Sequence, residues 1–208
     1  MYRYIDLSRR INNLTPAYPG DFPAKIMPGG TYDENGYVAS TLKMGLHTGT
    51  HIDFPQHFYP GGRAAADFSL ESFAGRGIML DVRGEKLISF KEDFSKRIKK
   101  GDVVLFFTGA EEYFGQDRYF EDHPAIERRL IALLSETGVR MVGFDTPEPD
   151  LSPFYAHRKL LESGIPIIEN LCGLEALLEE EKFEVFAMPL RIEAEASPAR
   201  VFARIRLK

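Results

Sequence analysis

Short apolar runs of strand length alternate along the chain with segments whose apolar residues recur at the spacing of a helix. The runs at 103–108 and 141–144 are short and partly β-branched, as is typical of buried strands. In the segment 124–137, apolar residues recur three and four positions apart, which predicts one buried helix face. Strands are expected at 4–7, 37–46, 78–82, 103–108, 141–144, 165–169, 183–190 and 199–207, and helices at 90–99, 124–137, 153–163 and 174–181.

Proline and glycine mark the ends of two of these predicted helices. Pro124 stands at the start of the first, and Gly138 follows directly after its end. In the second helix, Ser152 is expected to cap the N-terminus and Pro153 to be the first helical residue. Gly164 is expected to end that helix, because glycine adopts the left-handed conformation of a helix C-cap easily.

The alternation of strands and helices favours a mixed α/β domain over an all-β sandwich. We expect one domain over residues 1–208, with a mixed β-sheet core and flanking helices. The strand order does not follow from the pattern. The segment 11–36 is rich in Pro, Gly, Asn and Asp and is expected to form a long irregular loop. Loops of this length in a compact domain usually carry function.

Composition and charge narrow the functional classes. The chain has 208 residues, of which 44% are hydrophobic and 27% charged, and its net charge is −5, as is ordinary for a globular protein. Its one basic cluster, at 96–100, suits the last turn of a helix, so no nucleic-acid partner is expected. The apolar runs are far shorter than the roughly 20 residues of a membrane span. Asp6 stands where a signal peptide needs an apolar run, so we expect a cytoplasmic protein with no membrane partner.

Three of the five histidines fall within eleven positions, and a carboxylate lies among them. His47, His51 and Asp53 are separated by even numbers of residues, so in an extended strand their side chains project from one face. Gly49 lies on the same face, where the missing side chain would leave room for a metal ion and a water. Glycine and the adjacent threonines disfavour a helix here. The spacing therefore predicts a metal site on one strand.

His57 is set apart from this group by Pro55, which interrupts the pairing of a strand. Its side chain can therefore lie near a metal without binding it. The alternative is a chance grouping of unrelated surface or core histidines. Three histidines that share one short segment with an aspartate make that alternative the weaker one.

Two further residues could complete the site. His157 lies in the helix predicted after Pro153, and Glu169 ends an apolar strand. A carboxylate in that position is costly unless it is paired or binds a cation. Taken alone, a residue like His157 is more often an exposed helix residue, and one like Glu169 is more often a salt-bridge partner. The histidine cluster at 47–58 favours a functional role for both. His123 is expected to be structural, and Asp145 either supports the site or caps a turn.

The segment 47–58 resembles the signature of the cyclase family of metal-dependent hydrolases, which includes bacterial kynurenine formamidases and isatin hydrolases. That signature runs His-x-Gly-Thr-His-x-Asp-x-Pro-x-His-Phe, and every fixed position matches, from His47 to Phe58. Further similarity covers nearly the whole chain, in the segments 5–8, 18–21, 143–147 and 157–171. The resemblance implies a swivelling β/β/α fold and a homodimer.

The resemblance also implies a binuclear metal site. His47, His51 and Asp53 would hold the first ion. Asp53 and Glu169 would bridge the two ions, and His157 would bind the second. Ligands of this kind without a thiolate suit two divalent ions per chain, zinc in the first place and manganese as the alternative.

The expected activity is hydrolysis of a small aromatic or cyclic amide by metal-activated water, as in an arylformamidase. The resemblance makes His57 the catalytic acid/base and Tyr18 a substrate contact. Tyr18 stands where tryptophan-pathway formamidases usually have Trp, so a kynurenine-type substrate does not follow directly. A ring-opening hydrolase like isatin hydrolase is one alternative. A non-catalytic member that only binds metal or ligand is another, although the presence of His57 argues against it.

Overall fold

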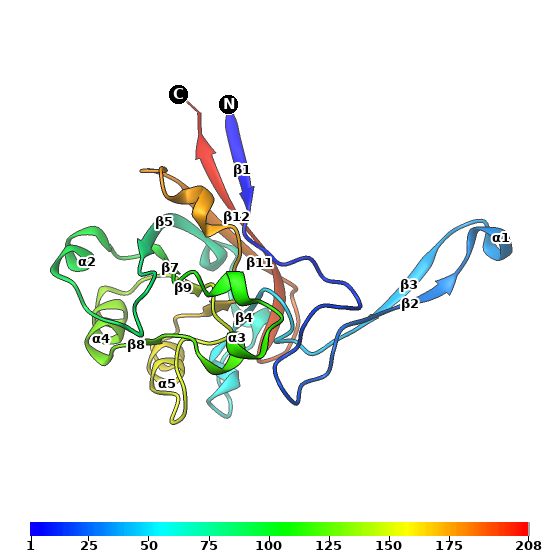
Figure 1. Ribbon diagram of the computed structural model, residues 1–208, viewed down its shortest axis with the longest axis horizontal. Helices are drawn as coiled ribbons and strands as arrows, with labels where there is room; N and C mark the ends of the chain where they lie inside the picture. The colour runs from blue at the N-terminus through cyan, green and yellow to red at the C-terminus, as the bar shows by residue number, and fades with distance from the viewer. Residues whose placement is uncertain (208) are drawn as a thin grey trace.

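The computed structural model describes residues 1–207, and its core is one mixed sheet of eight strands (Figure 1). The strand order is β1-β12-β11-β5-β7-β9-β10-β4, and an additional pairing joins β4 to β12. The strands are β1 (Tyr2–Asp6), β4 (His51–Asp53), β5 (Ala74–Asp81), β7 (Val103–Phe107), β9 (Met141–Phe144), β10 (Ile167–Glu169), β11 (Glu184–Pro189) and β12 (Ala196–Arg206). Following the pairings from β12 through β11 and onward to β4 leads back to β12, so the sheet closes on itself.

The central strands β5, β7, β9 and β10 run parallel, and the strands around them are antiparallel. Alternation along β7 shows why both faces of this sheet are apolar. Val103, Leu105 and Phe107 belong to one buried cluster, whereas Val104 and Phe106 belong to another. Parallel strands that are covered on both faces read as continuous apolar runs, as this one does.

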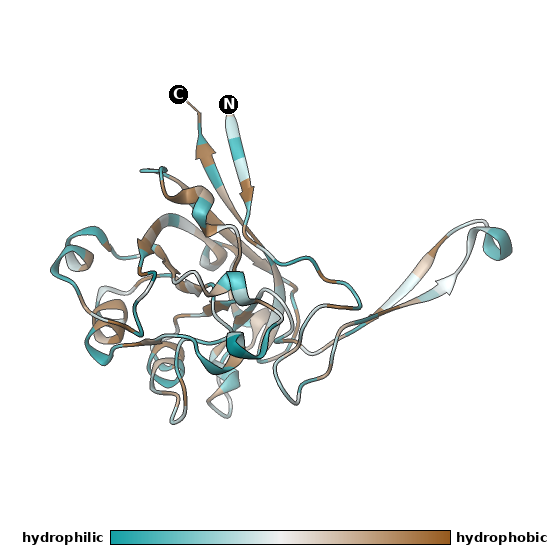
Figure 2. Cartoon of the chain, in the orientation of Figure 1, coloured by the Kyte–Doolittle hydropathy of each residue, from teal (hydrophilic) through white to brown (hydrophobic). Residues whose placement is uncertain are grey.

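The two apolar clusters lie on opposite faces of the sheet. The first gathers residues from β4, β7, β10, β11 and β12, among them Ile52, Ile168 and Val201. The second joins the sheet to α2 (Glu92–Arg97), α4 (Arg128–Thr137) and α5 (Tyr155–Glu162) through residues such as Leu130 and Leu160. Figure 2 shows apolar residues along the central strands and polar residues on the outer surfaces. A small helix, α3 (Asp117–Glu121), lies near the site described below. The mixed α/β class expected from the sequence is confirmed.

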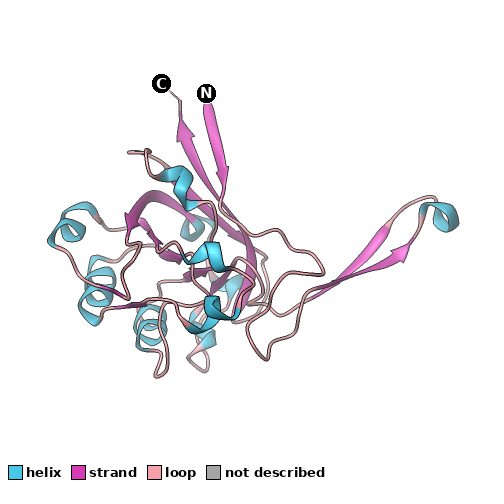
Figure 3. Cartoon of the chain, viewed as in Figure 1, coloured by secondary structure: helices cyan, strands magenta, loops and turns pink. Residues whose placement is uncertain are grey.

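A two-stranded ribbon projects from this body (Figure 3). It consists of β2 (Lys25–Gly30) paired with β3 (Ala39–Lys43), and the short helix α1 (Tyr32–Asn35) forms its tip. The prediction of an irregular loop over 11–36 is therefore wrong for its second half. Pro28, Gly29 and Gly30 concealed the strand, because neither residue type favours extended pairing.

Two predicted helices begin later than expected. Residues Ala125–Ile126 form a short strand, β8, which pairs with β6 (Leu87–Ile88), so Pro124 precedes a strand and α4 starts only at Arg128. Ser152 does not cap α5, because the Ser152–Pro153 peptide is cis and the helix starts at Tyr155. A side-chain oxygen of Asp150 accepts from the amide N–H of Ala156 and takes the capping role.

Other element boundaries also changed. The strand expected at 37–46 is confined to β3, and the helix expected at 90–99 is confined to α2. Only the single 3₁₀ turn Leu174–Leu177 lies in the segment 174–181.

Candidate metal centre and active site

The pairing of β4 with β10 brings two distant segments of the chain together. His51 lies opposite Glu169, and Ile52 lies opposite Ile168. Side chains directly opposite each other project from the same face of a sheet. The two isoleucines enter the first apolar cluster, so His51, Asp53 and Glu169 project from the other face, toward α5.

The strand that carries these donors is shorter than expected. β4 covers only His51–Asp53, and residues 47–50 form a turn, so the prediction of one extended strand through His47 is wrong. Gly49 has φ +69, a left-handed conformation that favours glycine. Its carbonyl oxygen accepts a 2.9 Å hydrogen bond from Nδ1 of His51, which directs Nε2 of His51 into the site.

A first group of donor atoms consists of Nδ1 of His47, Nε2 of His51 and Oδ1 of Asp53, which all lie within 4.8 Å of one another. The two histidine nitrogens are 3.3 Å apart. Oδ1 of Asp53 lies 3.0 Å from His47 Nδ1 and 3.3 Å from His51 Nε2. The turn therefore places His47 beside His51 and Asp53. The sequence analysis expected an extended strand to bring these residues together.

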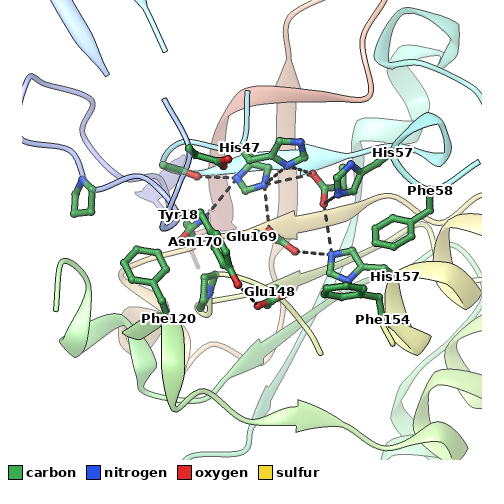
Figure 4. Close-up of a pocket in the computed structure, with 16 residues that line it drawn as sticks. Tyr18, His47, His57, Phe58, Phe120, Glu148, Phe154, His157, Glu169 and Asn170 are labelled. Atoms are coloured by element: carbon green, nitrogen blue, oxygen red, sulfur yellow. Dashed lines mark hydrogen bonds and ion pairs between the residues drawn. The ribbon is translucent and has the colours of Figure 1, made fainter. Parts of the chain in front are cut away.

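A second group shares Asp53 and adds His157 and Glu169, again with one donor atom of each within 4.8 Å of the others. Nε2 of His157 lies 3.2 Å from Oε1 of Glu169 and 3.7 Å from Oδ2 of Asp53. The other oxygen of Glu169, Oε2, lies 3.1 Å from Nε2 of His51. Each carboxylate thus presents one oxygen toward each side of the cluster. Figure 4 shows this arrangement for Glu169, which lies between the other site residues and His157.

Both carboxylate oxygens of Asp53 are buried, and within residues 1–207 neither accepts a well-aligned hydrogen bond. Glu169 is also buried. Two buried carboxylates side by side are costly unless positive charge compensates them. Imidazole and carboxylate donors that converge on one point are the ligands of zinc and related ions. The donor set therefore fits divalent cations.

The nearby carboxylates also shift the pKa values of the histidines. Burial lowers the pKa of His51, but the adjacent carboxylates of Asp53 and Glu169 outweigh burial and raise this pKa to about 10. The pKa values of His47 and His157 are raised against the same burial effect, chiefly by Asp53 for His47 and by Asp150 for His157. Without a cation, the carboxylates hold protons on these rings.

Asp150 is a supporting residue that the sequence reasoning missed. Its Oδ1 accepts a hydrogen bond of 2.6 Å from Nδ1 of His157, which leaves Nε2 of His157 facing the donor group. Partners of this kind orient a metal-binding histidine. The only available signal was an acidic residue in the Pro-rich segment 147–150, and the cis peptide that follows could not be inferred from it.

His57 lies beside the cluster and outside both donor groups. It ends the 3₁₀ turn Pro55–His57, and its Nε2 is 3.9 Å from Oδ2 of Asp53. Its ring centre is 4.6 Å from that of His47. Burial lowers the pKa of His57, so its imidazole favours the neutral form at neutral pH.

The donor groups open into a pocket of about 360 Å³ with aromatic walls. Tyr18 reaches this pocket from the N-terminal loop, and its hydroxyl donates a 3.0 Å hydrogen bond to Oε1 of Glu148. Its ring meets that of Phe120 edge to face, with 5.7 Å between centres. Phe58 and Phe154 line another part of the wall and pack near His157. Burial and the charge of Glu148 raise the pKa of Tyr18 to about 12, so its hydroxyl keeps its proton.

Asp145 has a structural role at the carboxyl end of β9. Its carboxylate accepts hydrogen bonds from the Thr108 amide at 2.9 Å, the Thr108 hydroxyl at 2.7 Å and the Gly109 amide at 2.8 Å. These bonds tie the ends of β7 and β9 together. His123 is buried, and its Nε2 lies 3.5 Å from Oε1 of Glu148.

Comparisons with known proteins agree with this fold and donor set. Residues 5–151 match the family model described as "Putative cyclase". A kynurenine formamidase of Bacillus mycoides is 31% identical over 97% of both chains, and one of Bacillus thuringiensis subsp. konkukian is 32% identical over 95% of both.

Solved structures share the fold. Isatin hydrolase A from Ralstonia solanacearum superposes with a TM-score of 0.84 at 23% identity and covers 99% of this chain and 92% of its own. A structure described as a "predicted metal-dependent hydrolase from Bacillus stearothermophilus" gives a TM-score of 0.78 at 26% identity and covers 99% of this chain and 100% of its own.

The fold, the donor set and these relatives together define a metal-dependent hydrolase. The chain belongs to the cyclase family. None of the helices described for residues 1–207 has the length and apolar character that crossing a membrane requires.

Proposed function

We propose that this protein hydrolyses the C–N bond of an aryl formamide or a closely related small aromatic amide. The observation that carries the proposal is the pair of donor groups sharing Asp53 at one end of an aromatic pocket. The pocket volume of about 360 Å³ suits one small aromatic molecule. The likeness to kynurenine formamidases over 97% of the chain supports the amide as the bond that is cleaved.

In this proposal, the site holds two divalent ions, zinc in the first place and manganese as the alternative. His47, His51 and Asp53 would hold one ion, and His157 with Glu169 and Asp53 would hold the other. Asp53 and Glu169 would serve both donor groups, because each points its two oxygens to different histidines. Bound ions of this kind polarise a carbonyl and lower the pKa of water toward about 7.

His57 completes the proposed chemistry as the residue that moves a proton. A neutral imidazole next to the donor groups can accept a proton from the attacking water and return it to the leaving nitrogen. In this proposal, the aromatic walls of the pocket hold an aromatic substrate in place through ring edges and faces. These walls are formed by Tyr18, Phe58, Phe120 and Phe154. Tyr18 is thus the proposed substrate contact.

Paired assays with N-formylkynurenine and isatin test this proposal against the ring-opening alternative, which the fold of isatin hydrolase A raises. We expect hydrolysis of the formamide, followed by its absorbance change, with a higher kcat/KM than for isatin. A higher kcat/KM for isatin would support the ring-opening alternative instead. Failure to hydrolyse either compound, in protein shown to hold metal, would contradict the proposal.

Metal binding should release protons. The pKa of His51 is raised to about 10 in the metal-free protein, so its ring carries a proton at pH 7 that a cation must displace, and the pKa values of His47 and His157 are raised as well. Affinity for zinc is therefore expected to rise with pH between 7 and about 10. Isothermal titration in buffers of different ionisation enthalpy measures the released protons. Binding that releases none, with an affinity independent of pH, would contradict the account of these histidines.

We also propose a homodimer in which the β2–β3 ribbon packs against the partner subunit. Every residue of β3 is exposed on both faces, and the exposed apolar residues of the ribbon are Ile26, Met27, Tyr32, Tyr37, Val38 and Leu42. An isolated two-stranded ribbon is only marginally stable in water, and an exposed apolar patch commonly marks an interface. The location in the cytoplasm stays a prediction from the sequence.

The double variant Val38→Lys, Leu42→Lys should convert the dimer to a monomer, because it places two charges in the proposed interface. Sedimentation velocity measures the change. Leu70→Lys is the matched control, because Leu70 is 75% exposed on the body of the protein. A monomeric wild type, or a variant that remains dimeric, would contradict the proposed interface.

A further inference from the structure

Asn170 is a polar residue of the site that belongs to neither donor group. It directly follows Glu169, lines the pocket and is only 5% exposed (Figure 4). Its backbone has φ 56, in the left-handed region, and two hydrogen bonds hold it there. Its N–H donates to the backbone oxygen of Thr146 at 2.9 Å, and its carbonyl accepts from the hydroxyl of Thr50 at 2.7 Å. The side chain therefore projects from a fixed backbone.

The side-chain amide of Asn170 lies between a tyrosine and a histidine. One end of the amide is 2.9 Å from the hydroxyl of Tyr119, and the other end is 3.5 Å from Nδ1 of His51. The hydroxyl of Tyr119 also lies 3.0 Å from the backbone oxygen of Asp145. All four residues are buried, so their polar atoms need partners within the protein.

Hydrogen-bonding chemistry decides which end of the amide faces His51. A backbone oxygen can only accept and a hydroxyl has one proton, so Tyr119 donates to Asp145 and can then only accept from Asn170. The amide therefore turns its NH2 group toward Tyr119 and its oxygen toward His51. The opposite orientation would set the NH2 group against Nδ1 of His51, which carries a proton because it donates to Gly49.

We propose that Asn170 is a positioning residue for the first donor group. Its side-chain oxygen is the second acceptor for Nδ1 of His51, beside the shorter bond to Gly49, and it keeps the proton on Nδ1. The lone pair of Nε2 is then free for a cation. Tyr119 fixes the amide by accepting from its NH2 group. This inference rests on the proposed function, because it requires that the first donor group binds a divalent ion.

Zinc titration of Asn170→Gly tests the inference. Glycine adopts the left-handed backbone without strain, so the variant removes only the side chain. In NMR spectra, the imidazole signals of His51 report on the first donor group and those of His157 on the second. We expect the zinc affinity of the first group, measured in competition with a chelator, to fall by about 10- to 100-fold, the usual cost of losing an orienting partner. The affinity of the second group should change much less.

Two further variants separate the hydrogen bond from the packing. Asn170→Asp keeps an acceptor oxygen opposite His51, so it should retain the zinc affinity. Tyr119→Phe keeps the ring but frees the amide, and it should weaken the first group by about 3- to 10-fold, as one neutral hydrogen bond would. Tyr59→Phe is its matched control, because it also removes a hydroxyl that donates to a backbone oxygen, that of Arg158 at 2.9 Å, and it should leave zinc affinity unchanged. Circular dichroism and the Tm verify that all variants fold.

The orientation of the amide can be measured in the wild type without a variant. The NH2 protons of Asn170 should show stronger nuclear Overhauser contacts to the ring protons of Tyr119 than to the Nδ1 proton of His51. The reverse order would overturn the inference, because the amide would then present a donor to His51.

Unchanged or tighter zinc binding by Asn170→Gly would also overturn the inference. An equal loss at both donor groups would overturn it as well, because Asn170 would then support the backbone beside Glu169 and not His51. Zinc binding as described without hydrolysis of any amide would support the inference and contradict only the proposed activity. If the wild type binds no zinc, the proposed function fails, and the Overhauser contacts in the metal-free protein decide the role of Asn170 separately.

Discussion

Replacing Asp53 with asparagine is expected to lower kcat/KM by about 10³-fold or more, because metal assistance is worth several kcal/mol in the transition state. Asp53 is the residue common to both donor groups. Asparagine keeps the shape of the side chain but removes the charge and one acceptor oxygen, so it cannot bridge two ions. Metal content, measured by elemental analysis after dialysis, should fall together with activity.

The matched control is Asp81→Asn, which makes the same chemical change at an exposed residue paired with Arg83 at the end of β5. It should leave both metal content and kcat/KM unchanged. Circular dichroism of the metal-free proteins shows whether Asp53→Asn keeps the fold. A folded Asp53→Asn protein with full metal content and full activity would exclude the shared site.

Replacing His57 with glutamine is expected to slow kcat by about 10²–10⁴-fold, the usual contribution of a general acid/base. Metal content should stay at the wild-type value, because His57 lies outside both donor groups. His51→Gln offers the contrast, since it removes a donor and should lose metal as well as activity. Metal loss in His57→Gln would make His57 a ligand, and unchanged kcat would remove it from the mechanism.

The pH profile gives a second readout of His57. Its pKa is lowered by burial, so the acidic limb of kcat/KM is expected below the ordinary value of about 6.5. The rate falls as pH decreases through this limb, because the protonated ring can no longer accept a proton. In His57→Gln, this limb should disappear while the residual rate remains measurable.

Local patterns were enough to find most of the donor residues. Even spacing placed His51 and Asp53 on one face of a strand, and the structure has them there. Glu169 stood out because a carboxylate ends an apolar strand, and its pairing with His51 accounts for the position. His47 lies beside these residues, as expected. The extended conformation expected for it was wrong, because Gly49 adopts a left-handed conformation and turns the chain before β4.

Long-range geometry set the limits of the sequence analysis. The register between β4 and β10 depends on two segments far apart in the chain, and no local pattern specifies it. Asp150 contacts His157 across the turn that precedes α5, and no local sequence pattern specifies the shape of that turn. Strand β2 was missed because Pro28 and Gly29 are unusual in a strand, whereas its partner β3 lies within the strand expected at 37–46.

Glu148 illustrates a different limit. In the sequence it lies between two prolines, a pattern that predicts an exposed turn. Its burial depends on Tyr18 and His123, which come from two separate loops. Side chains that meet in the pocket from separate loops are therefore harder to find from sequence than the donor residues of 47–53, because they share no spacing.

The central claim is that two ions share Asp53, and metal stoichiometry tests it most directly. Purified protein would be dialysed to equilibrium against micromolar zinc, and the metal per chain would be measured by elemental analysis. The two donor groups predict two zinc ions per wild-type chain. One ion or none per folded chain would contradict the claim.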